Sequence, residues 1–226
     1  MIHLFVDDMS PPRTLLALTA YALAMALVEA ALVVHLRHLY YPGNPQTLFP
    51  LALLTPADLA LELVRELATV VMIGAVAVLT ERGGARRFAA FVFVFGLWDL
   101  GYYAWLKVFL DWPRNWLEWD VLFLIPWPWF GPWPAAALIA LLFTAWGSLI
   151  LSNEHRPRWN LGTTLLFLGG CLAGLVAFLA PAWPLLPGGA AAFRGFVPET
   201  FAWPLWVFGF AAMAVALWQA WRRAAR

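Results

Sequence analysis

Long apolar runs separated by short polar segments make up most of this chain. Six runs reach the roughly 17 to 25 residues that an α-helix needs to cross the hydrocarbon core of a membrane. The pattern therefore predicts an all-α polytopic membrane protein, a bundle of six transmembrane helices in a single transmembrane domain over residues 1–226. The predicted spans are residues 15–36, 57–79, 88–110, 135–151, 161–180 and 201–221.

Composition agrees with a membrane protein. Charged residues make up 12% of the chain, whereas a soluble domain carries about 25%. The net charge of +1 gives no reason to expect nucleic acid as a partner, and the lipid bilayer is the expected surroundings. The single cysteine, Cys171, excludes an intrachain disulfide and a Cys-rich metal site. The first residues are acidic at Asp7 and Asp8 and lack a signal-peptide pattern, so we expect the first run to be retained as a helix.

Basic residues gather on one side of the predicted bundle. They lie before the first span, between spans two and three, between spans four and five, and after span six. Because cytoplasmic loops are enriched in Lys and Arg, we expect both termini in the cytoplasm, in a bacterial-type inner or plasma membrane. The loops 39–56, 111–134 and 181–200 then face outward. The basic residues are Arg13, Arg82, Arg86, Arg87, Arg156, Arg158, Arg222, Arg223 and Arg226.

The loop over residues 111–134 is rich in Trp and Pro. Trp prefers the membrane–water interface, and Pro interrupts regular helices. We expect this loop to lie along the outer interface as a lid, with a short helix around residues 115–124. A simpler interpretation is an aromatic belt that only anchors the protein.

Charged residues inside the spans are the most informative feature. On span two, Asp58, Glu62, Arg65, Glu66 and Thr69 follow the spacing of one helix face. Ionisable groups inside a membrane are costly and usually face a protein interior or a wet cavity. This stripe predicts a polar site that descends from the outer end of the helix to about the middle of the bilayer. Asp58, at the start of the span, has the position of a helix cap.

Two neighbouring spans add to this site. Span three places Asp99 near its midpoint, with Tyr103 and Lys107 on the same helix face, and span one contributes Glu29. Spans four to six, within residues 135–221, have no charged residue in their interiors. We therefore expect spans one to three, within residues 14–110, to hold the polar site and the last three to form an apolar scaffold, with Gly170 suited to close helix packing.

Carboxylates and imidazoles in a helical bundle are a typical ligand set for a metal such as iron or copper. The leading hypothesis is a metal-dependent membrane oxidoreductase that acts on a hydrophobic small molecule such as a lipid or quinone. Asp120, Tyr103 and Arg65 are the candidate catalytic residues, although Arg65 would repel a cation and is a natural partner for either neighbouring glutamate. The candidate metal ligands are Glu29, His35, His38, Glu62, Glu66 and Asp99.

Other functions stay open. The charged groups could form a buried ion-pair network, although such networks stabilise a fold less well than apolar packing does. A proton- or ion-coupled transporter would use buried carboxylates as proton carriers, but the inner half of the spans offers no polar continuation. A non-catalytic subunit of a larger membrane complex, or of a homo-oligomer, would use the charges or the apolar spans to bind its partner.

Overall fold

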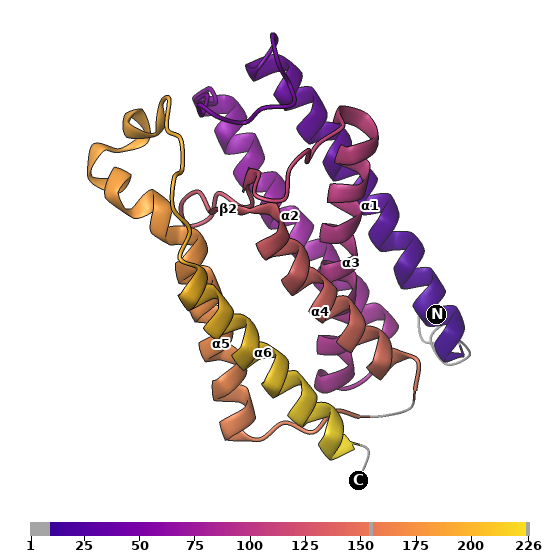
Figure 1. Ribbon diagram of the computed structural model, residues 1–226. Coiled ribbons are helices and arrows are strands. Elements are labelled where there is room, and N and C mark those ends of the chain that lie inside the picture. The colour runs from indigo at the N-terminus through magenta and orange to yellow at the C-terminus, as the bar shows by residue number, and fades with distance from the viewer. Residues whose placement is uncertain (1–9, 154–155, 225–226) are drawn as a thin grey trace.

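The computed structural model describes residues 10–153 and 156–224. Within these residues, six helices run the length of the molecule (Figure 1), and each is long and apolar enough to cross a membrane. The predicted all-α fold with six transmembrane helices is confirmed, and the chain is an integral membrane protein. The helices are α1 (Pro11–Tyr40), α2 (Pro56–Thr80), α3 (Gly84–Leu110), α4 (Trp133–Leu151), α5 (Leu161–Leu179) and α6 (Trp203–Ala224).

Local signals explain where the helices begin. At the start of α2, the Thr55 hydroxyl oxygen accepts a hydrogen bond from the Asp58 backbone N–H at 3.2 Å, while the Thr55 hydroxyl donates to the Asp58 carboxylate at 2.8 Å. Asp58 also accepts a hydrogen bond from the Tyr40 hydroxyl at the end of α1. The capping side chain is therefore that of Thr55, not Asp58 as predicted; Asp58 lies in the first turn, where its carboxylate accepts from the Thr55 hydroxyl and joins the ends of α1 and α2.

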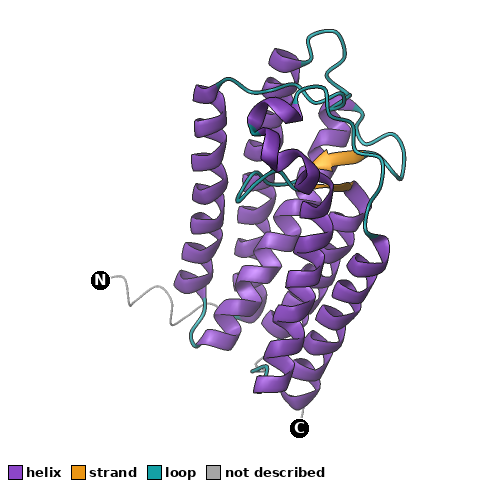
Figure 2. Cartoon of the chain, turned by 90° about the vertical axis from the view of Figure 1, so that its left-hand side faces the viewer, coloured by secondary structure: helices purple, strands orange, loops and turns teal. Residues whose placement is uncertain are grey.

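Helix α3 occupies the centre of one half of the bundle. Helices α1, α2 and α4 all pack against it, whereas α5 and α6 pack mainly against each other (Figures 1 and 2). Helices α5 and α6 approach each other closely at Gly170, where an added Cβ would lie 2.7 Å from the Gly209 carbonyl oxygen. The prediction that Gly170 permits close helix packing is thus confirmed.

The short helix expected around residues 115–124 was wrong. This segment contains the strand β1 (Trp119–Val121), which pairs antiparallel with β2 (Phe130–Pro132). A helix is disfavoured because Pro126 and Pro128 follow closely, and pairing with β2 supplies partners for the strand backbone. Gly131 permits this arrangement, since an added Cβ there would lie 2.5 Å from the Phe178 ring of α5.

The tryptophans of this loop do not share one role. Trp112 is buried, whereas Trp116 is 76% exposed. Part of the segment therefore packs into the bundle, and only part of it is available to the membrane interface. Together with residues 41–55 and the 3₁₀ helices η2 (Ala180–Gly188) and η3 (Ala190–Phe193), the hairpin covers the end of the bundle opposite the termini (Figure 2).

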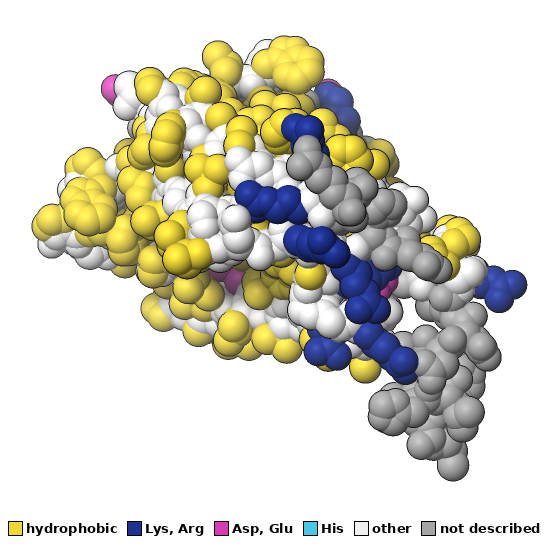
Figure 3. All heavy atoms as spheres, turned by 90° about the horizontal axis from the view of Figure 1, so that it is seen from below, with side chains coloured by type: hydrophobic (Ala, Val, Ile, Leu, Met, Phe, Trp, Pro, Cys, Tyr) yellow, Lys and Arg dark blue, Asp and Glu magenta, His cyan; other side chains and the backbone are white. Residues whose placement is uncertain are grey.

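The end of the molecule that holds the termini is basic. Figure 3 shows Lys and Arg side chains gathered across this end. The start of α3 carries Arg86 and Arg87, the end of α6 carries Arg222 and Arg223, and Arg82 lies just after α2. This distribution agrees with the charge pattern that predicts cytoplasmic termini, and the orientation itself stays a prediction.

Candidate functional site: a charged pocket between α1, α2 and α3

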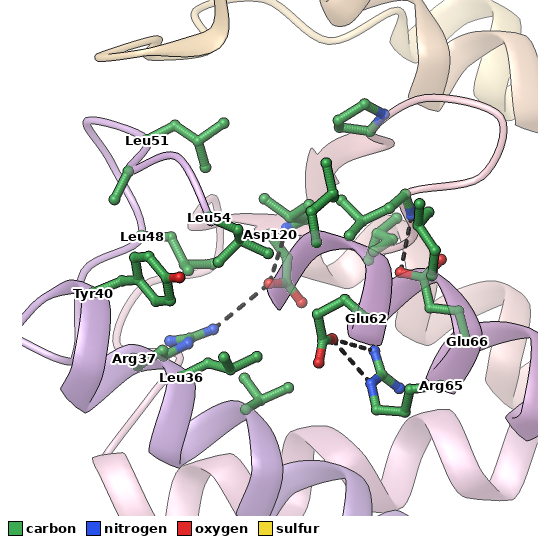
Figure 4. Close-up of a pocket in the computed structure, with 18 of the residues that line it drawn as sticks. Leu36, Arg37, Tyr40, Leu48, Leu51, Leu54, Glu62, Arg65, Glu66 and Asp120 are labelled. Atoms are coloured by element: carbon green, nitrogen blue, oxygen red, sulfur yellow. Dashed lines mark hydrogen bonds and ion pairs between the residues drawn. The ribbon is translucent and has the colours of Figure 1, made fainter. Parts of the chain in front are cut away.

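A pocket of about 440 Å³ lies at the covered end of the bundle (Figure 4). Its walls come from α1, α2 and α3, and residues 48–54, 120–128 and η3 complete it. Most of the wall is apolar, because leucines from both helices and loops line it. The leucines are Leu36, Leu48, Leu51, Leu53, Leu54, Leu59, Leu63, Leu122 and Leu124. The charged residues are Glu29, Arg37, Glu62, Arg65, Glu66, Asp99 and Asp120.

Arg65 joins α1 to α2 across this pocket. Its Nε lies 2.9 Å from Oε2 of Glu62, its Nη2 lies 2.8 Å from the same oxygen, and its Nη1 pairs with Glu29. Both glutamate side chains are largely buried. Since α1 and α2 each pack against α3 rather than closely against each other, this ion-pair network and the hydrogen bond from Tyr40 to Asp58 are polar links between them. The candidate catalytic role of Arg65 stays a prediction, and its contacts in the structure are those of a pairing residue.

Glu66 has a different partner. It forms no ion pair with Arg65 in the described residues, and both of its carboxylate oxygens accept a hydrogen bond from the Leu124 backbone N–H, at 2.9 and 3.0 Å. The carboxylate therefore ties α2 to the segment that connects β1 and β2. A helix face explains how Glu62, Arg65 and Glu66 reach one pocket, but the partner of Glu66 depends on how the hairpin folds.

Arg37 and Asp120 form a second, separate pair. The Arg37 side chain is only 2% exposed, and its Nη2 lies 3.6 Å from Oδ1 of Asp120 (Figure 4). The guanidinium carbon also lies 4.2 Å from the centre of the Trp112 ring, a cation–π contact. Burial raises the pKa of the Asp120 carboxyl to about 6, although the nearby Arg37 charge acts to lower it. The structure thus places Asp120 in the pocket wall, and its candidate catalytic role stays a prediction.

Arg37 lines the pocket and is absent from the candidate residues that the sequence predicts. One signal could have found it: Glu29, Val33 and Arg37 follow at intervals of four residues and therefore share one face of α1. All three line the pocket.

Asp99 lines the pocket without a partner. It makes no hydrogen bond or ion pair with any residue that the structure describes. Tyr103, from the same helix, is buried near Asp120 and packs between Trp112 and Trp133, with ring centroids 6.0 and 5.6 Å away. Tyr103 is thus one layer behind the residues that line the pocket.

The two histidines do not reach the pocket. His35 and His38 are exposed, and their Nδ1 atoms hydrogen-bond to backbone carbonyls of the preceding helical turn, at 2.6 and 2.8 Å. Of the six predicted metal ligands, the structure brings together the four carboxylates and leaves the two imidazoles outside. Within residues 10–153 and 156–224, no group of three or more His, Cys, Asp or Glu side chains is placed to hold a metal ion.

The pocket combines apolar walls with an excess of carboxylates. Five carboxylates and two guanidinium groups line it, and Arg65 is shared between two of the carboxylates. Groups of this kind can hydrogen-bond to the polar end of a molecule or exchange protons with it. No protein family model, curated protein or solved structure matches this chain, so the pocket itself carries the functional argument.

Proposed function

We propose that this chain is a membrane enzyme that takes a hydrophobic substrate from the bilayer into the pocket between α1, α2 and α3. The observation that carries the proposal is the pocket of about 440 Å³, in which leucine walls surround a set of charged side chains. Small-molecule sites typically combine a mostly apolar lining with a few converging polar groups. Asp99 would supply acid–base chemistry, because it lines the pocket with no hydrogen-bond or ion-pair partner among the described residues.

The arrangement of charge supports an enzyme over a transporter. The charged residues of α1, α2 and α3 end at Glu29, Glu66 and Asp99 on the side of the bundle that holds the termini. Beyond them, these helices carry no charged side chain until their ends near the basic face. A transported ion would need polar groups through the whole membrane, whereas an enzyme needs them only at the pocket. The basic face supports placing the termini in the cytoplasm and the pocket at the outer side.

Replacing a leucine of the pocket with the larger tryptophan tests the proposal. Leu63 lines the pocket, whereas Leu61 on the same helix is 62% exposed and lies outside it. Purified wild-type protein and Leu61→Trp should both retain a hydrophobic molecule, identified by solvent extraction and mass spectrometry, and Leu63→Trp should lose it. Incubation with a membrane lipid extract should then show one compound consumed by wild type and not by Asp99→Asn. Equal retention by all three proteins would refute the proposal.

A metal-dependent oxidoreductase is the second candidate. The observation that favours it is the convergence of Glu29, Glu62, Glu66 and Asp99 on one pocket. Without the histidines, the donors are all oxygen, which suits manganese or other hard cations better than copper. Arg65 already pairs with two of the four, and no three of these side chains are placed to hold an ion among the described residues, so a bound metal would have to draw Glu66 and Asp99 together. Elemental analysis should find about one metal per chain, reduced in Glu66→Gln and unchanged in Glu199→Gln, and a metal-free active protein would exclude this candidate.

A further inference from the structure

Arg37 is a buried cation whose hydrogen-bond donors are unused. A guanidinium carries five N–H donors, and Nε, Nη1 and Nη2 of Arg37 all lack a hydrogen-bond partner among the described residues. The Asp120 oxygen at 3.6 Å balances the charge but is too far for a good hydrogen bond. Because leaving buried donors unpaired is costly, their position on the pocket wall suggests that a bound molecule supplies the acceptor.

The Trp112 ring limits the positions around the Arg37 guanidinium that a bound molecule could occupy. The ring covers one face of the guanidinium at 4.2 Å, and Asp120 lies beside it. Figure 4 shows Arg37 and Asp120 facing each other, with Tyr40 and Leu36 close to Arg37. The guanidinium is therefore held in place in the wall of a leucine-lined space, with its N–H groups buried and unpaired among the described residues.

The charge of the pocket favours an uncharged acceptor. Asp120 already balances Arg37, and the remaining carboxylates outnumber their cation, Arg65. An anionic head group would add another negative charge to this set, at a cost that grows in apolar surroundings. A carbonyl oxygen accepts the same hydrogen bonds and adds no charge.

We propose that Arg37 anchors the substrate by donating hydrogen bonds to an uncharged carbonyl oxygen at the end of an apolar chain, as in an ester, ketone or quinone. The inference rests on the proposed hydrophobic substrate and specifies its polar end. Arg37 acts here as a binding residue, and Trp112 and Asp120 position it. The carbonyl can belong to an ester-linked membrane lipid or to a free lipophilic molecule, and these two sources share the same chemistry.

Matched photoreactive probes test the anchor. Three twelve-carbon probes carry a diazirine in mid-chain and differ only at the end, which is a methyl ketone, a carboxylate or a plain methyl group. The protein is purified in a maltoside detergent, which has no carbonyl group, and labelled peptides are mapped by mass spectrometry. We expect the ketone to label peptides of the pocket about tenfold more than the other two, as loss of a hydrogen bond to a charged donor implies.

The variants separate the anchor from general stability. Arg37→Gln should lower pocket labelling by the ketone to the level of the hydrocarbon probe. Because this variant leaves Asp120 unpaired, Arg37→Gln/Asp120→Asn provides a second variant in which both groups are neutral, and it should show the same loss. Arg194→Gln, an exposed arginine at the same end of the bundle, should label like wild type.

Each outcome has a distinct meaning. Equal labelling of the pocket by all three probes, unchanged in both Arg37 variants, overturns the anchor and leaves the hydrophobic pocket standing. Preference for the carboxylate overturns it in favour of an anionic head group. Failure of every probe to label the pocket overturns the proposed function as well. Where the ketone is preferred, its labelling of the pocket is measured again in nanodiscs made of ester-linked or of ether-linked lipid. Lower labelling in the ester-linked lipid alone assigns the carbonyl to a membrane lipid. Unchanged labelling in both lipids assigns it to a free molecule.

Discussion

The buried carboxyl of Asp120 makes the stability of this protein depend on pH in a predictable direction. Burial raises its pKa to about 6, and the groups that interact with it are Arg37 from α1, three residues of α3 and the Val121 backbone N–H; the α3 residues are Asp99, Tyr102 and Tyr103. In the unfolded chain an aspartate has a pKa of about 4. The native state therefore binds more protons than the unfolded state between pH 4 and pH 6.

The size and sign of the effect follow from linkage. Because protons stabilise the native state in this range, the contribution of Asp120 to the free energy of unfolding falls as pH rises from 4 to 6. The difference between pKa values of about 6 and about 4 corresponds to about 3 kcal/mol. Asp120→Asn removes the titrating group. The unfolding free energy of wild type minus that of the variant should therefore decrease by about 3 kcal/mol between pH 4 and pH 7.

The assay is denaturant unfolding in mixed micelles at a series of pH values, for wild type, Asp120→Asn and a control. Glu199→Gln is the control, because Glu199 is an exposed carboxylate at the same end of the molecule. Its difference from wild type should stay flat across the series. A flat difference for Asp120→Asn would refute the reasoning, since it would mean that Asp120 titrates alike in the native and unfolded states. A difference that increases with pH would mean that Arg37 outweighs burial.

Two further predictions concern the ion pairs and the helix packing. Arg65→Gln leaves Glu29 and Glu62 as uncompensated buried carboxylates, so the free energy of unfolding should fall by about 3–5 kcal/mol, and a variant with all three residues changed to Gln should recover most of it. Failure of this triple variant to recover stability would show that the cost comes from packing. Gly170→Val should lower the free energy of unfolding by about 1–3 kcal/mol, because an added Cβ would lie 2.7 Å from the main chain of α6. The control is Gly169→Val, whose side chain meets open space. Its thermal unfolding should be nearly that of wild type.

The helices could be predicted from the sequence because one physical requirement determines them. A segment that crosses hydrocarbon must be apolar, long and internally hydrogen-bonded, and each of these properties is local. The ends were less predictable. Helix α1 begins at Pro11 and ends at Tyr40, four residues beyond the predicted span on each side. Its polar last turn extends past the apolar run, so hydropathy alone could not find it.

The candidate site was partly predictable because the spacing of residues along a helix face is also a local property of the sequence. Helical spacing placed Glu62 and Glu66 on one face, and the structure brings Glu29 and Asp99 to the same pocket. The pair of Arg37 with Asp120 was beyond such reasoning, because it depends on a β-hairpin that packs back into the bundle. The hairpin in turn packs against residues far along the chain, such as Phe178 of α5, and a local pattern in the sequence does not predict such contacts.

The hydrogen bonds from the Leu124 backbone to Glu66 have a consequence for how the pocket opens. Lifting the hairpin away from α2 would leave the Glu66 carboxylate and the Leu124 amide without hydrogen-bond partners in apolar surroundings. We therefore expect the hairpin and α2 to move as one body. Exchange of the Leu124 amide hydrogen would then measure how often the two separate. Entry from the lipid between α1 and α2 would leave these hydrogen bonds intact but would have to pass the ion pair of Arg65 with Glu29.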